Sequence, residues 1–173
     1  DKLALIERLA HSGLKDIEVS SFVRPTWIPQ LADASDVVSN LPQIEGVRYW
    51  ALVPNRRGLE RAIAAGVGHI ATFMSASQTH NQKNLNRTQR ETLRGLRSVH
   101  EIAKDEGLVV RSYISTVFGC PYEGDVAAEA TLDLSLQLLE SGADTIALGD
   151  TTGMANPRQV TEMVQGLVDS GIP

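Results

Sequence analysis

The stretch ESGADTIALGD (Glu140–Asp150) decides the fold of this chain. It consists of the end of a helix, a glycine and a short apolar segment with β-branched residues. Glycine just past a helix is typical of a left-handed cap, because it has no Cβ to clash at positive φ. A short apolar segment of this kind is typical of a buried parallel strand. The stretch therefore predicts a helix that stops at Gly142 and a strand that leads to Asp150.

The same pattern of helix end and glycine occurs at four more places. They are HSGLKDIEVSSF, AAGVGHIATFMSA, DEGLVVRSYIST and, at the end of the chain, DSGIP, with glycines Gly13, Gly66, Gly107 and Gly171. One further strand, VRYWALV (Val47–Val53), follows Gly46 without a convincing helix directly before it. Strands that begin near residues 16, 47, 69, 109 and 145 alternate with helices, which is typical of a parallel sheet with crossover helices.

Helical periodicity fills the segments between the strands. In NPRQVTEMVQGLVDSG, Asn156 is a good N-cap, Pro157 suits the first helical position, and apolar residues recur every three or four positions. A similar stripe lies between Thr88 and Glu106. The leucines of TLDLSLQLLESG alternate as in a strand, but its length and its apolar face favour a helix.

A closed barrel of eight units and a doubly wound open sheet both produce this alternation. No G-x-G-x-x-G follows any strand, which disfavours the dinucleotide-binding sheet. The first helix has no strand before it, and the last one stops where another strand should begin. We therefore expect an α/β fold that is a partial (βα)8 TIM barrel, about strands 2 to 6 with helices 1 to 6. Residues 1–173 would be a single domain, a piece of a catalytic barrel cut at both ends.

Composition excludes several classes of function. The chain has 173 residues, of which 42% are hydrophobic and 21% charged, as in an ordinary globular protein. A net charge of −5 argues against a nucleic-acid-binding surface. No apolar run approaches the roughly 18 residues that span a bilayer. The single cysteine, Cys120, cannot form an internal disulfide.

Two acids are set beside apolar strands, where a carboxylate is costly to bury unless it meets a cation, a metal or hydrogen-bond donors. Glu18 lies within DIEVSSF, and Asp150 ends TIALGD. In parallel α/β proteins functional groups gather at the carboxyl ends of strands, so both are candidates for chemistry. The alternative is that Glu18 pairs with a structural arginine and Asp150 caps a turn.

The histidines and lysines are less informative. We expect His11 and His100 to lie on helices at or near the surface and His69 to begin a strand, which leaves only His80 in a carboxyl-end loop. No complete metal site can be assembled from this chain. Lys83, in HNQKNLNR, is expected in a loop, where it suits a phosphate or carboxamide contact or is merely hydrated.

Four segments together resemble 3-hydroxy-3-methylglutaryl-CoA lyase: IEVSSFVRPTWIPQLAD, KNLNR, VRSYISTVFGCPYEG and LGDTTG. The resemblance covers essentially the whole chain, with the segments in matching order and spacing. It implies a divalent-metal (βα)8 barrel that cleaves hydroxymethylglutaryl-CoA to acetyl-CoA and acetoacetate, in leucine degradation and ketone-body formation. Retro-Claisen cleavage of this kind must remove the proton of a tertiary hydroxyl and protonate an enolate carbon.

The resemblance also implies roles for individual residues. Glu18 and Asp150 match acidic active-site positions, and Ser21, Tyr113 and Thr151 would line the substrate pocket. Lys83 and Asn84 would lie near the CoA arm. The family's metal ligands match no residue here, so ligands of Mg2+ or Mn2+ are expected in segments missing from this chain, and residues 1–173 alone are expected to be inactive. Cys120 stands in a look-alike of the family's catalytic cysteine loop and is interpreted as a small buried thiol at a turn.

Two alternatives stay open. One is a related acyl-CoA condensing barrel of the isopropylmalate or homocitrate synthase type. The other is a non-catalytic barrel segment that only binds a ligand or partner. For the lyase we expect an acyl-CoA substrate, a homodimer or other homo-oligomer, no nucleic-acid or membrane partner, and a location in the bacterial cytoplasm or the mitochondrial matrix.

Overall fold

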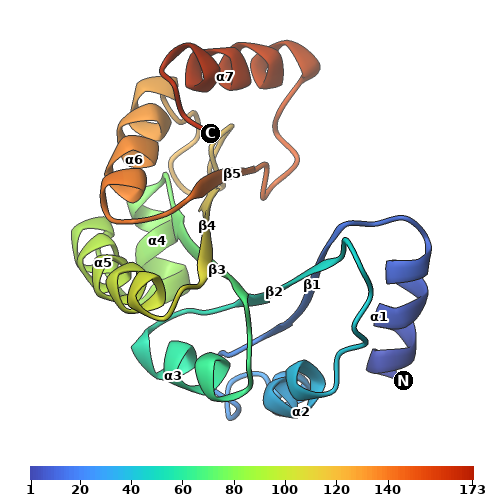
Figure 1. The fold of residues 1–173 in the computed structure, drawn as a ribbon. Helices are drawn as coiled ribbons and strands as arrows, with labels where there is room; N and C mark the ends of the chain where they lie inside the picture. Colours follow the sequence, from blue (N-terminus) through green and yellow to red (C-terminus); the bar gives the residue numbers. More distant parts are fainter. The chain divides into compact units, whose positions relative to one another are not determined.

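The computed structural model describes all residues from 1 to 173, and Figure 1 shows the order of its elements. Five strands alternate with seven α-helices and one 3-10 helix. The strands are β1 (Asp16–Ser21), β2 (Arg48–Leu52), β3 (His69–Ser75), β4 (Val109–Ser115) and β5 (Thr145–Gly149). The helices are α1 (Lys2–His11), η1 (Pro29–Leu31), α2 (Ala34–Ser39), α3 (Arg56–Ala64), α4 (Gln78–Leu85), α5 (Gln89–Asp105), α6 (Ala128–Glu140) and α7 (Pro157–Asp169).

The chain divides into two compact units. The first contains residues Asp1–Thr72 and Ile102–Val109. Within it β1 pairs with β2 and β2 with β3, both in parallel. Its core includes Leu59 and Ala62 of α3 and Ile70 of β3, none of which exposes surface. Asn55 begins α3 because its side chain accepts a hydrogen bond from the Gly58 amide, which satisfies one of the unpaired donors of the first turn.

The second unit contains residues Phe73–Glu101 and Val110–Pro173. Within it β4 pairs with β5 in parallel, from Arg111 opposite Thr145 to Ser115 opposite Gly149. Side chains of β4 alternate, with Val110, Ser112 and Ile114 buried. Figure 1 shows α5 and α6 on one side of β4, and the side chains of Ser112 and His100 hydrogen-bond on that side.

The predicted elements are largely confirmed. All five strands begin within one residue of the expected positions, and TLDLSLQLLESG lies in helix α6. Helix α7 begins with a capping box, in which Asn156 and Gln159 each accept from the other's backbone amide. The parallel alternation of strands and helices is that of a partial barrel.

Two sequence-based expectations about secondary structure and burial are wrong. The segment that was expected to be a loop after β3 contains helix α4, so His80, Lys83 and Asn84 are helical. His100 was expected near the surface but is fully buried, where Ser141 and Ser112 hydrogen-bond its two ring nitrogens at 2.8 and 3.3 Å. Buried polar groups normally need such partners, and both serines lie outside the helix that carries His100.

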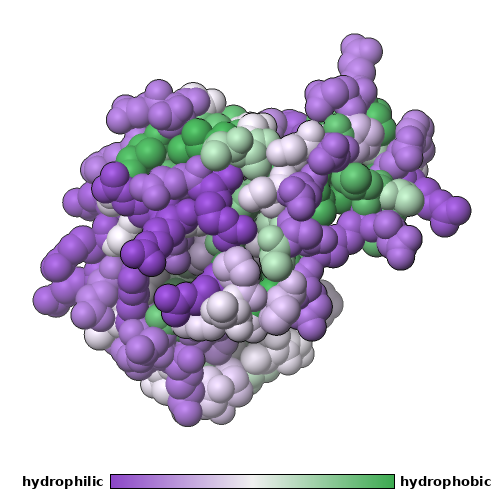
Figure 2. Space-filling model, turned by 90° about the horizontal axis from the view of Figure 1, so that it is seen from below, coloured by the Kyte–Doolittle hydropathy of each residue, from purple (hydrophilic) through white to green (hydrophobic).

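The surface is mixed in polarity. Figure 2 shows a face on which hydrophilic residues predominate and hydrophobic areas are exposed between them. Exposed apolar side chains include a row on α7 formed by Val160, Val164 and Val168. None of the helices combines the length and the apolar composition that crossing a bilayer requires.

Candidate functional site

In the second unit, hydroxyl groups connect the carboxyl ends of three successive strands. Ser75 ends β3, and its Oγ lies 2.7 Å from Oγ1 of Thr116, the residue after β4. The Thr116 amide donates to Oγ1 of Thr151, two residues after β5, at 3.0 Å. Thr116 is buried and has a φ of +59°, so the chain turns sharply there. These bonds fix the loops after β4 and β5 to the end of β3.

Asp150 follows β5 directly, as the sequence predicted. Its Oδ1 accepts from the Met154 amide at 3.0 Å and its Oδ2 from the Ala155 amide at 3.2 Å. The carboxylate is exposed, so each oxygen keeps a lone pair for another partner. Asp150 therefore does cap a turn, as the alternative interpretation proposed, and its catalytic role remains a prediction.

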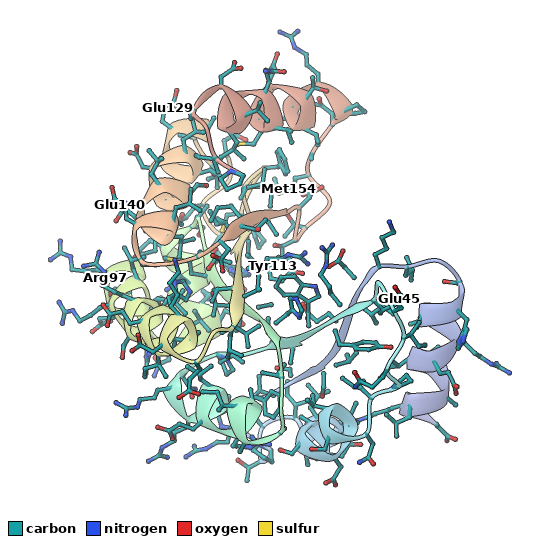
Figure 3. All side chains as sticks on the ribbon, viewed as in Figure 1. Glu45, Arg97, Tyr113, Glu129, Glu140 and Met154 are labelled. Atoms are coloured by element: carbon teal, nitrogen blue, oxygen red, sulfur yellow. The ribbon has the colours of Figure 1, made fainter.

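Tyr113 and Thr151 lie near this point of the second unit. Figure 3 shows Tyr113 on the side of β4 away from α5 and α6, and its ring is half-buried. The Thr151 side chain is exposed apart from the hydrogen bond with Thr116. The substrate contacts of both residues stay a prediction.

The loop that follows β4 contains Cys120, whose burial at a turn is confirmed. Cys120 is 1% exposed and forms an isolated antiparallel bridge with Gly124. Its thiol donates to Ser77 Oγ at 2.9 Å, and the Tyr122 amide donates to its sulfur at 3.4 Å. Burial raises the pKa of the Cys120 thiol, whereas the Ser77 hydroxyl and the Tyr122 and Glu123 amides lower it because they can donate to the thiolate, and the net pKa lies below the ordinary value for cysteine.

Lys83 and Asn84, the predicted CoA contacts, lie on α4 with exposed side chains. The Lys83 ammonium lies 4.5 Å from the centre of the Tyr122 ring, which is a cation–π contact. This contact connects α4 to the Cys120 loop.

The sequence analysis missed the residues that hold α4 in place. Ser77 caps it by accepting from the His80 amide at 3.0 Å, and Glu123 accepts from the Thr79 amide at 2.6 Å. Asn81 is fully buried and connects three segments, because it accepts from the Ser75 amide and donates to Arg87 O and Thr92 Oγ1. Ser77 before a polar segment was the one available signal for a helix start.

In the first unit, Glu18 and Ser21 lie on β1. The pairing of β1 with β2 shifts register between Glu18 and Ser20, as in a β-bulge. A bulge breaks the alternation of side chains, so Ser20 and Ser21 are both buried while Glu18 is exposed. The Ser21 hydroxyl is buried and has no hydrogen-bond partner in the protein. The Ser20 hydroxyl is buried without a partner as well, so the substrate contact of Ser21 stays a prediction.

Acids also lie at the amino ends of strands, where they serve structure. At the start of β1, Asp16 accepts from Arg48 Nε at 2.7 Å and Trp50 Nε1 at 2.8 Å. The hydrogen bond with Asp16 raises the pKa of Arg48. Just before β5, Asp144 accepts from the Val110 amide at 2.8 Å. In each case the carboxylate joins two neighbouring strands.

The residues of this chain do not form a metal site by themselves. Nowhere do three His, Cys, Asp or Glu side chains gather as the ligands of an ion would. The location of metal ligands in other segments stays a prediction.

The HMGL-like family model matches residues 1–171, and the chain belongs to this family. Within the family it is similar to proteins that are named as lyases. It is 48% identical to hydroxymethylglutaryl-CoA lyase YngG of Bacillus subtilis over 168 residues, which are 97% of this chain and 56% of that protein.

Solved structures agree. The crystal structure of Bacillus subtilis HMG-CoA lyase superposes with a TM-score of 0.93 over 98% of this chain and 57% of that one. An HMG-CoA lyase of Acinetobacter baumannii, solved with coenzyme A and 3-methylmalate, has a TM-score of 0.92 and 34% identity, covering 97% of this chain and 55% of that one. The fold is thus the barrel of these lyases in part, and the chain spans about half the length of the relatives it matches.

Proposed function

We propose that the protein to which residues 1–173 belong cleaves 3-hydroxy-3-methylglutaryl-CoA to acetyl-CoA and acetoacetate. The main support is 48% identity to a hydroxymethylglutaryl-CoA lyase over 97% of the chain. A related lyase bound to coenzyme A supports an acyl-CoA substrate. The reaction removes the proton of the tertiary hydroxyl and breaks the adjacent carbon–carbon bond. The bonding electrons pass to the thioester enolate, whose carbon then takes up a proton.

We propose that Asp150 is the residue of this chain that contacts the reacting hydroxyl of the substrate. Its backbone hydrogen bonds with Met154 and Ala155 fix the carboxylate in one orientation. The remaining lone pairs can then accept the substrate hydroxyl without further reorganisation, which is what electrostatic preorganisation requires. Thr151 and Tyr113 are proposed substrate contacts of the same unit.

Glu18 and Ser21 are the proposed contributions of the first unit. Ser21 is the last residue of β1, and its place at the carboxyl end of the strand supports the substrate contact that the resemblance implies. Glu18 would hold a cationic group of the site, which its exposed carboxylate can do.

Lys83 and Asn84 are proposed to contact the CoA arm. An ammonium and a carboxamide on one exposed turn of α4 suit phosphate and pantetheine groups. For the full-length protein we also propose a divalent metal, a homo-oligomer, and a bacterial cytoplasmic or mitochondrial matrix location, on the support of the family membership.

The test is a product assay with the full-length protein. Incubation with 3-hydroxy-3-methylglutaryl-CoA and Mg2+ or Mn2+ should release acetoacetate and acetyl-CoA in equal amounts, as detected by mass spectrometry. A parallel incubation with acetyl-CoA and a 2-keto acid should give no condensation product. Condensation without cleavage would contradict the lyase and favour a synthase.

A further inference from the structure

The loop after β4 contacts α4 with one side chain after another. Glu123 Oε1 accepts from the Thr79 amide at 2.6 Å, and the Cys120 thiol donates to Ser77 Oγ. Tyr122 covers the ammonium of Lys83 and lies 6.3 Å from the His80 ring. The loop thus touches both turns of the helix that carries the proposed CoA contacts.

Helix α4 depends on contacts from outside for its stability. It has only eight residues and no acidic side chain in its first turn. Helices this short are marginal by themselves, and unpaired amides at their first turn favour a negative charge. Ser77 satisfies the third of these amides and Glu123 satisfies the second. Hydrogen bonds from Thr79 lower the pKa of Glu123, and bonds from Ser77 and Gln78 lower it to a smaller extent. The carboxylate is therefore charged at neutral pH.

We propose that Glu123 is a positioning residue for acyl-CoA binding, because it holds the first turn of α4 and so fixes Lys83 and Asn84 where they meet the CoA arm. Tyr122 assists by restricting the Lys83 side chain. The loop therefore determines affinity for the CoA portion of the substrate and has little part in the bond cleavage itself. This inference rests on the proposed function.

The variant Glu123→Gln in the full-length protein tests this role. The amide keeps the size of the side chain and one acceptor but loses the charge that strengthens the bond to Thr79. We expect KM for 3-hydroxy-3-methylglutaryl-CoA and Kd for free CoA to rise together by about three- to tenfold, with kcat within about twofold. Glu123→Ala should raise KM and Kd further, again with kcat nearly unchanged. The matched control is Glu129→Gln, because Glu129 is likewise an exposed acid but belongs to the first turn of α6, and this change should leave KM and Kd unchanged.

A double variant separates positioning through Lys83 from a general loss of structure. If Glu123 acts through Lys83, then adding Glu123→Ala to Lys83→Met should raise KM much less than Glu123→Ala does alone. Additive effects, an unchanged KM, or a fall in kcat at constant KM would each overturn the proposal. Should the wild type bind CoA but not cleave the substrate, the proposed function fails, and the Kd values for CoA still decide the role of Glu123.

Discussion

The two ends of the strands use polar side chains in different ways. At the amino ends, two aspartates each join one strand to its neighbour. Asp16 accepts hydrogen bonds from the Arg48 and Trp50 side chains, and Asp144 accepts one from the Val110 amide. At the carboxyl ends, neutral hydroxyls of Ser75, Thr116 and Thr151 connect the loops. The acids at the amino ends bind groups of the neighbouring strand. Asp150 instead accepts hydrogen bonds from two amides of its own loop, and its carboxylate oxygens keep lone pairs for another partner. With the proposed role of Asp150, the stabilising acid Asp144 and the catalytic acid would lie at opposite ends of β5.

The largest expected effect comes from the acid at the carboxyl end of β5. Asp150→Asn removes a charge and one acceptor, since an amide nitrogen cannot accept the backbone bond. We expect kcat to fall by about a hundredfold or more, with a smaller change in KM, in steady-state assays of the full-length protein. Asp144→Asn, at the other end of the same strand, is the control and should keep kcat within about twofold. If Asp150→Asn kept the wild-type kcat, the only role of Asp150 would be to cap the turn after β5.

The variant Asn81→Ala tests whether polar contacts at the carboxyl ends of the strands also stabilise the fold. Asn81→Ala leaves the buried Ser75 amide unpaired and removes the bonds to Arg87 and Thr92. We expect a loss of about 2–3 kcal/mol in the free energy of unfolding, measured by urea denaturation. Asn84→Ala, on the exposed side of the same helix, should change stability by less than about 0.5 kcal/mol and instead weaken CoA binding. Equal effects of the two variants on stability would contradict this division.

At the amino end, Asp16→Asn should affect stability alone. The amide still accepts from Trp50 but loses the ion pair with Arg48, in which both side chains are partly exposed. We expect a small decrease in the urea midpoint that shrinks as salt is added, with unchanged kcat. A change in kcat would show that the amino end is coupled to the chemistry.

For Cys120 we expect a minor effect on turnover. Cys120→Ser keeps a hydroxyl donor near Ser77 and changes little in volume, so kcat should stay within about tenfold of wild type. The measurement is again steady-state kinetics of the full-length protein. A thousandfold loss would identify the loop after β4 as part of the catalytic apparatus.

Most of the fold was predictable because local rules suffice for it. Glycines such as Gly142 end helices and apolar β-branched segments follow, and neither signal depends on distant residues. Helix α4 was missed for the opposite reason, since QTHNQKNL has no apolar face and little tendency to form a helix. Its partner Glu123 lies 44 residues from Thr79, farther along the chain than a periodicity can reveal. The burial of His100 could not be predicted for the same reason, because its hydrogen-bond partner Ser141 lies 41 residues away in the sequence.

The candidate site was predictable only in part. Asp150 was recognisable from its place after an apolar strand, and the resemblance supplied Tyr113 and Thr151. No pattern could show that the Thr151 hydroxyl pairs with the Thr116 amide, or that a bulge in β1 would bury Ser21. Both depend on backbone geometry that forms only when neighbouring strands are in register.

The left-handed backbone of Thr116 sets local strain against a bond between two strand ends. A β-branched residue at a φ of +59° is strained by roughly 1–2 kcal/mol, which a glycine would avoid. Glycine, however, has no hydroxyl to meet Ser75 Oγ. Thr116→Gly should therefore relax the turn while loosening the junction of the two strands. Threonine at position 116 thus accepts a local backbone strain and in return provides the hydroxyl that ties the end of β3 to the end of β4.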